Sequence, residues 1–528
     1  MAESSQAKRR KTMLADLYLP NECWEYIITF HIDHNPSMKS LSIVSKQFLS
    51  ITNRLRFSFT LCYQTVPFLP LLFGRFTNLN SLNLTSFYCN LDGLLRQISC
   101  FPLKLTSLNL SNHNNIPTDG MRAFSKKITT LTSLTCSNMK SINSTDIFLI
   151  SDCFPLLEVL DLSDPHHCEE YKEVEPPLLI LSKLRKVNLS RHHYIDDKLI
   201  FHLFKNCKFL EKAIMLMCFG ITFDGIGSAL RERPTLKSLS FSNAYFATSI
   251  TSYFISSLVS SKSLTCLDLT SSNISNELLY SIAREGLPLT RLCLQSCKGY
   301  SYDGLFCLLS KCRHIQHLDL GVTDFLNDQH VVELSLFLRE LESINLSNCC
   351  KLTVSAFFAV VKNCPSLSDI KMELTSIGKK SPESSKSLID FTARPQLKYL
   401  CLAHNQWLTD ENIIMFASIS PNLQLLNLSS CRGIEDGIAQ VLRLCPNIRH
   451  FNLSYCSRVK LQELNFEVLK LEVLNLSYTN VDDQTLYVIS KSFRGLLQLL
   501  LEYCTNVTKM GAKHVVENCT ELRLIKFS

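Results

Sequence analysis

Hydrophobic residues recur in pairs from Leu82 onward, with one other residue between the two members of each pair. The stretches "SLNLTS", "CLDLTS" and "FNLSYC" show the pattern. The first hydrophobic residue of each pair falls at Leu82, Leu108, Leu134, Leu160, Val187, Ile214, Leu239, Leu267, Leu292, Leu318, Ile344, Ile370, Leu400, Leu426, Phe451, Leu474, Leu499 and Ile525. The 17 intervals average close to 26 residues and range from 23 to 30. Such internal repetition predicts an array of like units.

Each unit contains the pattern of one strand and one helix. Alternation across the pair predicts a short strand. A turn with Asp and Gly often follows, as in "SYDGLFCLLSKC" and "IEDGIAQVLRLC". Beyond it, Leu305, Leu308 and Leu309 share one helical face, as do Ile438, Val441 and Leu442. The prediction is an α/β solenoid of about 18 repeats over residues 62–528, with a curved parallel sheet inside and helices outside.

Cysteines follow the same period. Five lie three residues after the second member of a pair: Cys297, Cys349, Cys431, Cys456 and Cys504. Six lie six or seven residues before a pair: Cys153, Cys207, Cys312, Cys364, Cys445 and Cys519. Eleven of 23 cysteines thus occupy two repeat positions, which favours buried free thiols over disulfides or a metal site. The units, most clearly "CPNIRHFNLSYCSRV", resemble the cysteine-containing class of leucine-rich repeats.

The residue inside each pair faces outward on the strand and is usually Asn or Asp. Such positions are Asn83, Asn109, Asp161, Asn188, Asp268, Asp319, Asn345, Asn427, Asn452 and Asn475. We interpret them as a hydrogen-bonding ladder that suits the repeat, and seven of them form Asn-x-Ser/Thr sequons for the same reason. Other residues replace the ladder at Met215, Ser240, Cys293, Lys371, Cys401, Leu500 and Lys526, which are our candidates for a substrate-binding face.

Two segments interrupt the period. They are residues 164–177, "DPHHCEEYKEVEPP", and residues 378–387, "GKKSPESSKS". Both are polar and are expected to be loops. His166, His167 and Cys168 are potential metal ligands, but three adjacent residues do not converge on one ion without a supporting shell, so we predict no metal site and no cofactor.

The segment 14–61 lies before the repeats and has the pattern of three short helices. Pro20 suits a first helical position, and Trp24, Ile27 and Ile28 fall on one side of the helix that follows. A second helix begins near Ser37, and a third carries Phe48. Fewer than fifty residues make a poor independent core, so part of this apolar surface is expected to contact a partner.

"LPNECWEYIITF" and "LSIVSKQFLSITNRLR" resemble an F-box, and their form is similar to plant F-box proteins in particular. Together with the repeats, the chain is identified as an F-box/leucine-rich-repeat protein. "FHIDHNPSM" departs from the family pattern, which puts the start of the second helix in doubt. The resemblance implies a non-catalytic substrate receptor of an SCF ubiquitin ligase, which acts in ubiquitin-dependent protein catabolism. Its F-box binds a Skp-type adaptor and, through it, a cullin, while the repeats hold a protein substrate.

By position in the motif, the expected adaptor contacts are Leu19, Pro20, Trp24, Ile27, Ile28, Leu41, Val44, Ser45 and Phe48. Some of these side chains must also hold the three helices together. We expect the edge with Trp24 and Ile28 to face the adaptor.

Two alternatives stay open. One is a hormone co-receptor similar to the auxin and jasmonate receptors, although the inner positions lack the dense basic cluster that such a receptor needs. The other is a repeat scaffold outside any ligase. An enzyme is not supported, because no phosphate-binding loop, metal spacing or triad signature is present.

The composition limits the cellular locations and partners that we expect for the protein. The net charge of +7 comes from 54 basic and 47 acidic residues, without the concentrated basic stripe of a nucleic-acid-binding domain. The first ten residues lack the apolar core of a secretory signal, and no apolar run approaches about 18 residues. We therefore expect a cytoplasmic or nuclear protein with no membrane or nucleic-acid partner. Residues 1–13 are expected to be a disordered basic tail, and "KRRK" within it is a candidate nuclear import signal.

Overall fold

The computed structural model describes residues 19–31, 36–167, 181–193, 195–242, 250–379 and 393–527. The chain divides into two compact units, Met1–Ala213 and Ile214–Ser528. Nearly every strand is followed by a helix, and every strand pairing within either unit is parallel. The fold is the expected α/β leucine-rich-repeat solenoid. The residues of the basic tail, most of both predicted loops and Cys168 lie outside the described residues.

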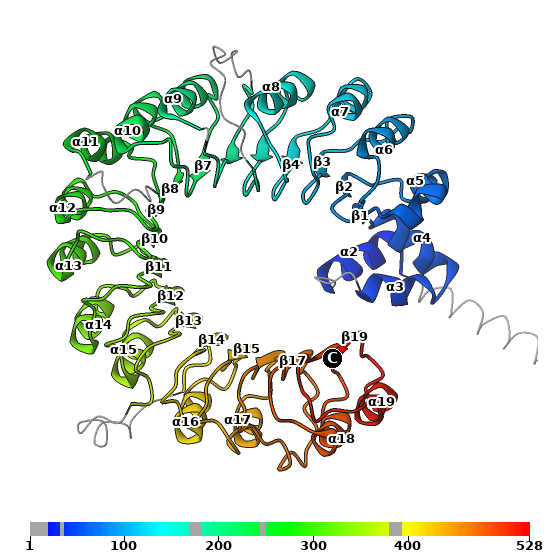
Figure 1. Ribbon diagram of the computed structural model, residues 1–528, viewed down its shortest axis with the longest axis vertical. Coiled ribbons are helices and arrows are strands. Elements are labelled where there is room, and N and C mark those ends of the chain that lie inside the picture. The colour runs from blue at the N-terminus through cyan, green and yellow to red at the C-terminus, as the bar shows by residue number, and fades with distance from the viewer. Residues whose placement is uncertain are drawn as a thin grey trace, which may run out of the picture. The chain divides into compact units, whose positions relative to one another are not determined.

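The first unit begins with three helices and continues into repeats (Figure 1). The helices are α2 (Asn21–His31), α3 (Pro36–Ser42) and α4 (Lys46–Arg54). The repeat elements are β1 (Ser58–Thr60), η1 (Tyr63–Phe68), α5 (Leu69–Arg75), β2 (Ser81–Asn83), α6 (Leu91–Ile98), β3 (Ser107–Asn109), α7 (Thr118–Ser125), β4 (Ser133–Thr135), α8 (Ser144–Cys153), β5 (Val159–Asp161), β6 (Lys186–Asn188) and α9 (Asp197–Asn206). Strand β7 (Lys212–Met215) contains the boundary between the units.

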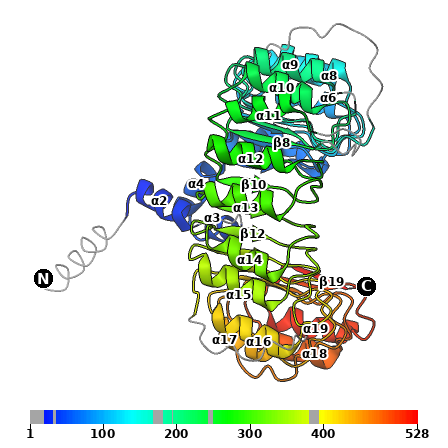
Figure 2. The same cartoon turned by 90° about the vertical axis from the view of Figure 1, so that its left-hand side faces the viewer.

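The second unit repeats the strand and helix alternation, with strands on the inner side of an arc and helices on its outer side (Figures 1 and 2). Its elements are α10 (Phe223–Glu232), β8 (Ser238–Phe241), α11 (Ser252–Ser260), β9 (Cys266–Asp268), α12 (Asn276–Glu285), β10 (Arg291–Cys293), α13 (Tyr302–Lys311), β11 (His317–Asp319), α14 (Asp328–Ser335), β12 (Ser343–Asn345), α15 (Val354–Asn363), β13 (Asp369–Lys371), β14 (Tyr399–Cys401), α16 (Asp410–Ile419), β15 (Leu425–Asn427), α17 (Ile438–Leu444), β16 (His450–Asn452), β17 (Val473–Asn475), α18 (Asp483–Ser492), β18 (Gln498–Leu501), α19 (Lys509–Asn518) and β19 (Leu524–Phe527).

Neighbouring strands pair like position with like position. Leu82 is opposite Leu108, and Ile344 is opposite Ile370. Because the middle residue of each short strand points into the core, these pairs form a continuous buried column within each unit. The helices close the other side of the core, where Phe357 of α15 lies 4.5 Å from Phe416 of α16 between ring centroids. The predicted helical faces of α13 and α17 are buried as expected.

The sheet begins earlier than predicted. Strand β1 (Ser58–Thr60) pairs with β2 and so belongs to the repeats. The predicted helical segment 14–61 contains these residues, and the first strand was expected near Leu82. The predicted boundary between the helical segment and the repeats, at residues 61 and 62, therefore lies too far toward the C-terminus. Phe59 and Leu61 form a hydrophobic pair 23 residues before Leu82, an interval equal to the shortest of the series, so the repeat pattern extends one unit further toward the N-terminus than predicted.

The register of one predicted strand is wrong by one residue. In β7 the buried residues are Ala213 and Met215, both fully inaccessible, while Ile214 points outward. Met215 is therefore a core residue and not a substrate-face candidate. The correct register also places Cys218 three residues after the buried pair, at the position that five other cysteines occupy. Ile214 was predicted to be the first buried residue of this strand because it is bulkier and more hydrophobic than Ala213.

One described coil lacks its helix. Residues 453–472, between β16 and β17, contain turns and no helical segment. Leu461, Leu464 and Val468 fill the same core space from this irregular chain and are at most 5% exposed. The expectation of one helix per unit is therefore wrong for this coil, whose 23-residue interval is the shortest of the series.

Ten of the eleven repeat cysteines are buried and Cys153 is half-buried, and several of them donate hydrogen bonds. All 22 cysteines among the described residues are free thiols. The Sγ of Cys297 lies 2.9 Å from the carbonyl oxygen of Leu269, and the Sγ of Cys456 lies 3.1 Å from that of Leu428. In both cases the acceptor lies where the preceding coil leaves its strand. Each of these carbonyls also accepts a backbone amide, that of Ser272 and that of Cys431 respectively, so the thiol is a second donor to it.

A left-handed backbone position follows almost every strand. It lies four residues after the first buried residue of the strand, and we call it the turn position. Non-glycine residues adopt a positive φ there at Asn112, Asn138, Asp164, Arg191, Met217, Ser271, Ser296, Val322, Asn348, Leu374, His404, Ser430, Tyr455, Tyr478 and Tyr503. Asn and Asp tolerate this conformation best, so the larger side chains in the series need a separate explanation.

Candidate functional site

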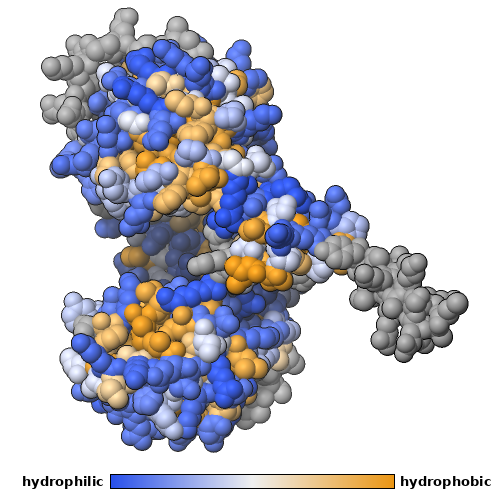
Figure 3. Space-filling view, turned by 90° about the vertical axis from the view of Figure 1, so that its right-hand side faces the viewer, coloured by the Kyte–Doolittle hydropathy of each residue, from blue (hydrophilic) through white to orange (hydrophobic). Residues whose placement is uncertain are grey.

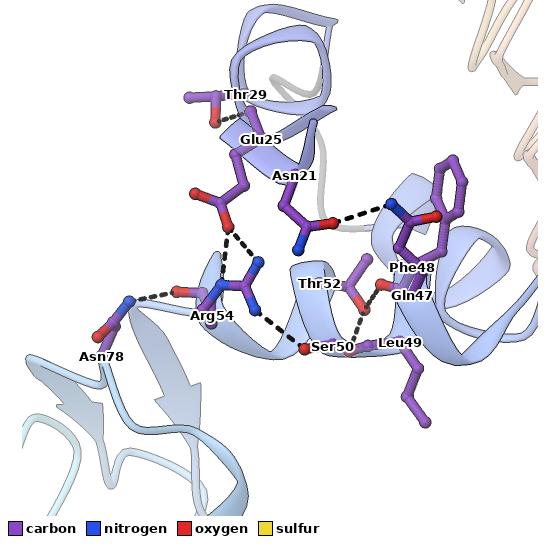
Figure 4. A network of polar contacts seen from close by, with 10 residues as sticks. All are labelled: Asn21, Glu25, Thr29, Gln47, Phe48, Leu49, Ser50, Thr52, Arg54 and Asn78. Carbon is purple, nitrogen blue, oxygen red and sulfur yellow. Dashed lines mark hydrogen bonds and ion pairs between the residues drawn. The ribbon is translucent and has the colours of Figure 1, made fainter. Parts of the chain in front are cut away.

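Two polar contacts hold α2 against α4 (Figure 4). The Nε of Arg54 donates to the Glu25 carboxylate at 2.7 Å, and the Gln47 side chain donates to Asn21 at 2.9 Å. The Oγ of Ser45 accepts a hydrogen bond from the Phe48 amide at 3.1 Å and so caps α4. The polar residues between the helices therefore fix the mutual orientation of α2 and α4.

The interior of the helical segment contains several of the expected adaptor residues. Ile28 is 4% exposed and Ile51 is inaccessible, so both are core residues. The ring of half-buried Trp24 lies 5.0 Å from that of Phe48. The expectation that Ile28 faces a partner is thus wrong, because on this helix it lies on the side that packs against α4. Ile27 and Leu41 are half-buried.

Apolar side chains remain exposed at the turn between α3 and α4. Ile43 is 84% exposed and the adjacent Val44 is 65% exposed. Leu19 and Pro20, just before α2, are also exposed, and Tyr26 is exposed on α2 itself. Figure 3 shows hydrophobic residues at the surface of this part of the molecule. Exposed apolar side chains gathered on so small a segment indicate a surface that another protein covers.

Sequence reasoning missed Ile43 and Tyr26. Both stand in the stretches that carry the resemblance, but the expected contacts follow the position of each residue in the motif. Those contacts include Val44 of the same turn and leave out its neighbour Ile43. Ser45, an expected contact, is exposed and has its own structural role as a cap.

A short connection joins the helical segment to the repeats. Only Leu55, Arg56 and Phe57 separate α4 from β1. The carbonyl oxygen of Phe57 accepts hydrogen bonds from the amides of Asn80 and Ser81, each at 3.0 Å. Arg75 donates to Asn53 at 2.8 Å, and the Asn78 side chain donates to the carbonyl oxygen of Arg54 at 3.0 Å (Figure 4). The helices are thus fastened to the first coil on both sides of the connection.

The Asn and Asp ladder has a local structural role. The side-chain oxygen of every predicted ladder residue accepts a hydrogen bond from the backbone amide two residues later. Examples are Asn109 with Ser111 at 2.9 Å and Asn452 with Ser454 at 3.1 Å; the set also includes Asn83, Asp161, Asn188, Asp268, Asp319, Asn345, Asn427 and Asn475. This is the Asx-turn that ends each strand. The ladder is therefore explained by folding.

The substrate-face candidates lie on the strands but do not form one cluster. Lys371 is beside Cys401 in the strand register, and Leu500 is beside Lys526, while Ser240 and Cys293 each neighbour Asp268 across their strands. Lys371 and Lys526 are exposed, and Ser240, Cys293 and Leu500 are half-buried.

The two candidate thiols are occupied within the fold. Cys401 is 9% exposed, and its Sγ lies 2.8 Å from the Glu373 carboxylate. Burial raises the pKa of Cys293 and of Cys401 to about 12. Both therefore stay protonated at neutral pH and are poor nucleophiles. Among the described residues, no group of three or more His, Cys, Asp or Glu is arranged to hold a metal ion. No described helix has the length and apolarity to cross a bilayer.

Comparison with known proteins supports the repeat assignment. A family model described as Leucine Rich repeat matches residues 260–283. The chain is 24% identical over 468 residues to a Transport inhibitor response 1-like protein of rice, Oryza sativa subsp. japonica, which covers 82% of this chain and 73% of the rice protein. It is 26% identical over 162 residues to F-box/LRR-repeat protein 4 of Bos taurus, covering 30% of this chain and 25% of the bovine protein.

A putative RNA-binding protein of Caenorhabditis elegans is 26% identical over 317 residues, which cover 58% of this chain and 37% of that protein. Among solved structures, the mouse RP105/MD-1 complex aligns with a TM-score of 0.43 at 16% identity, over 85% of this chain and 78% of that one. The yeast Rad7 and Elc1 complex aligns with a TM-score of 0.39 at 15% identity, over 97% and 94%. By its repeats and its fold, the chain is a leucine-rich-repeat solenoid, similar in sequence to F-box/leucine-rich-repeat proteins.

Proposed function

We propose that this chain is the substrate-recognition subunit of an SCF ubiquitin ligase, in which the helices α2–α4 form an F-box that binds a Skp-type adaptor. The observation that carries the proposal is the α3–α4 turn. Ile43 and Val44 are exposed there, while Ile28 and Ile51 of the same segment are buried. Exposure of apolar side chains to water is unfavourable in free energy, and burial against a partner removes this cost.

The repeats would hold the protein to be ubiquitinated. The three-residue connection would couple adaptor binding by α2–α4 to substrate binding by the repeats. Because the helices are hydrogen-bonded to the first coil, an adaptor held by a cullin would also fix the direction of that coil. The rate gain would then come from keeping a target lysine near the conjugating enzyme, which is catalysis by proximity, with no bond chemistry on this chain.

The sequence similarity to a bovine protein named as F-box/LRR supports this assignment, and the rice Transport inhibitor response 1-like protein matches over 82% of this chain. The proposal places the protein in the cytoplasm or the nucleus, where SCF ligases act. The resemblance to plant F-box proteins suggests a plant Skp-type adaptor as the first to test.

Co-purification of the full chain with a Skp-type adaptor and cullin tests the proposal. The double variant Ile43→Glu with Val44→Glu should abolish recovery of the adaptor, because two carboxylates would be buried at the interface. Both side chains are exposed, so the variant should fold. Ile28→Ala is unsuitable here, because it would remove core contacts.

The matched control is Leu469→Glu, since Leu469 is 68% exposed and lies in the irregular coil between β16 and β17. It should recover the adaptor as well as the unaltered chain does. Failure of the unaltered chain to bind any Skp-type adaptor, or equal binding by the double variant, would overturn the proposal.

A further inference from the structure

Three tyrosines form a row on the second unit. Tyr455, Tyr478 and Tyr503 occupy the turn positions after β16, β17 and β18. Their rings stack in sequence, with centroids 4.2 Å apart between Tyr455 and Tyr478 and 4.4 Å apart between Tyr478 and Tyr503. They are 50%, 40% and 61% exposed, respectively. We call this set the tyrosine row.

The tyrosine row is held in a costly backbone conformation. The φ angles are 63°, 59° and 59°, in the left-handed region that bulky residues rarely adopt. Other described coils place various residues at this position, among them Asn348, Ser430 and Leu374, but none of them places a tyrosine there. Residues in such sparsely populated regions concentrate at functional sites. Three aromatic rings in succession are therefore not explained by the needs of the turn.

A groove lies beside the row. Its volume is about 590 Å³, and its lining includes Gln406, Arg432, Tyr455, Arg458 and Tyr478. Arg458 is paired with Glu435 at 3.2 Å. Arg432 is exposed and, among the described residues, makes no ion pair. The groove thus combines a free guanidinium with aromatic edges and hydroxyl groups. Trp, Tyr and Arg are the side chains most enriched at the energetic centres of protein interfaces.

The chemistry of the groove favours an acidic partner. Arg432 supplies an unpaired positive charge that can form bidentate hydrogen bonds with a carboxylate. Desolvation and the hydroxyl groups of Tyr455 and Tyr503 raise the pKa of Tyr478 to about 12, so this hydroxyl stays protonated at neutral pH. The lining of the groove contains arginine and tyrosine side chains and no carboxylate.

A nucleic acid fits less well. Its bases bind by stacking on open aromatic faces. The inner faces of the tyrosine row already stack on one another at 4.2 and 4.4 Å, which leaves no space for a base between them.

We propose that the groove and the tyrosine row bind an acidic, extended peptide segment of a target protein. This deepens the proposed function and rests on it for the role of that target as a ligase substrate. Recognition then takes place at the turns that follow the strands, where three rings and Arg432 are displayed. The Asn and Asp of the strand face are committed to their Asx-turns.

The test is selection of short random peptides displayed on phage against the full chain, followed by fluorescence anisotropy with the enriched peptides. We expect enrichment in Asp and Glu. Arg432→Glu should weaken binding by about tenfold or more, the loss typical of a charge-assisted contact. Tyr478→Asn should also weaken binding, and because Asn suits the left-handed turn position, this variant should be at least as stable as the unaltered chain.

Matched controls are Arg313→Glu and Tyr88→Ala, which alter an exposed arginine and an exposed tyrosine away from the groove. Both should bind the peptides normally. The inference would be overturned if the enriched peptides lacked acidic residues, or if Arg432→Glu and Tyr478→Asn bound them normally. It would also be overturned if a single-stranded oligonucleotide displaced the bound peptide more effectively than a competing acidic peptide does.

Adaptor recovery by the same variants separates the two proposals. Arg432→Glu and Tyr478→Asn should both recover the adaptor. If the unaltered chain binds acidic peptides but no adaptor, the ligase proposal fails and the peptide site stands. If it binds the adaptor while the variants bind the peptides normally, the peptide site fails and the ligase proposal stands.

Discussion

At the scale of single residues, one repeat position shows how different side chains make the same kind of hydrogen bond. The third residue after each buried strand pair is Cys431 in one coil, Asn405 in another and His192 in a third. All three donate to a backbone carbonyl of the preceding coil: Cys431 to Leu402 at 3.2 Å, Asn405 to Met372 at 2.8 Å, and His192 at 2.6 Å to Leu162. Other coils place Phe87 or Met139 there, so the position does not require a donor, but where a donor is present cysteine is its commonest form.

His192 makes the first coils sensitive to acid. Burial lowers its pKa from 6.5 to about 4, against a weaker opposing effect of its hydrogen bond to Leu162. Between these two values the unfolded chain binds a proton and the folded chain does not, so stability falls as the pH falls. Lowering the pH from about 7.5 to about 5 should reduce the free energy of unfolding by roughly 2 kcal/mol through this residue.

The measurement is urea unfolding of the full chain at both pH values. His192→Cys supplies the side chain that other coils use here and should remove this part of the pH dependence. His450→Gln, at an exposed histidine, should leave it unchanged. Equal pH dependence in His192→Cys and the unaltered chain would show that His192 is not the group that titrates.

At the scale of elements, strand β7 tests the corrected register. Met215 is inaccessible and Ile214 points outward, so Met215→Asp should bury an unpaired carboxylate and lower the melting temperature strongly. Ile214→Asp should be tolerated, with a change of no more than about 0.5 kcal/mol. Circular dichroism melting of both variants checks this prediction. The opposite ranking would restore the register expected from sequence.

Sequence alone predicted much of the fold, because the period of the hydrophobic pairs recurs too often to arise by chance. Its errors have physical causes. Ala213 is a small core residue that hydrophobicity ranks below Ile214. The pair Phe59 and Leu61 lies at the shortest interval of the series and was not counted with the repeats. The helix missing between β16 and β17 is replaced by a chain whose leucines still reach the core, so the hydrophobic count there looks normal.

The candidate sites were less predictable. The expected contacts follow the position of each residue in the F-box motif. They include the buried Ile28 and the exposed Val44 of the α3–α4 turn, but not the adjacent Ile43, which is more exposed. The tyrosine row was missed because its members lie outside the hydrophobic pairs and become neighbours only when the coils stack. The signal was present as a tyrosine four residues after the first pair member in three successive units.

At the scale of the whole molecule, stability in a solenoid is a sum over coils and their immediate neighbours. Phe416 is 1% exposed and packs against Phe357 of the preceding helix. Phe416→Ala should therefore cost about 3–5 kcal/mol, and the loss should be local.

Hydrogen exchange followed by mass spectrometry checks this expectation. Exchange should accelerate in α15, α16 and α17 and stay unchanged in α6, which lies in the first unit. Leu469→Glu, at an exposed residue, serves as the control and should change neither region. Uniform acceleration throughout the chain would mean that the repeats unfold as a single cooperative body.

The matched register of the strands has an evolutionary consequence. Because Leu82 pairs with Leu108 and Ile344 with Ile370, every coil presents its neighbour with the same backbone interface. A gene duplication or deletion of one whole period would join compatible surfaces and leave both the α3–α4 turn and the tyrosine row intact. The chain can therefore change length in steps of one coil, and its descendants can vary the number of coils between the two proposed binding surfaces without redesigning either.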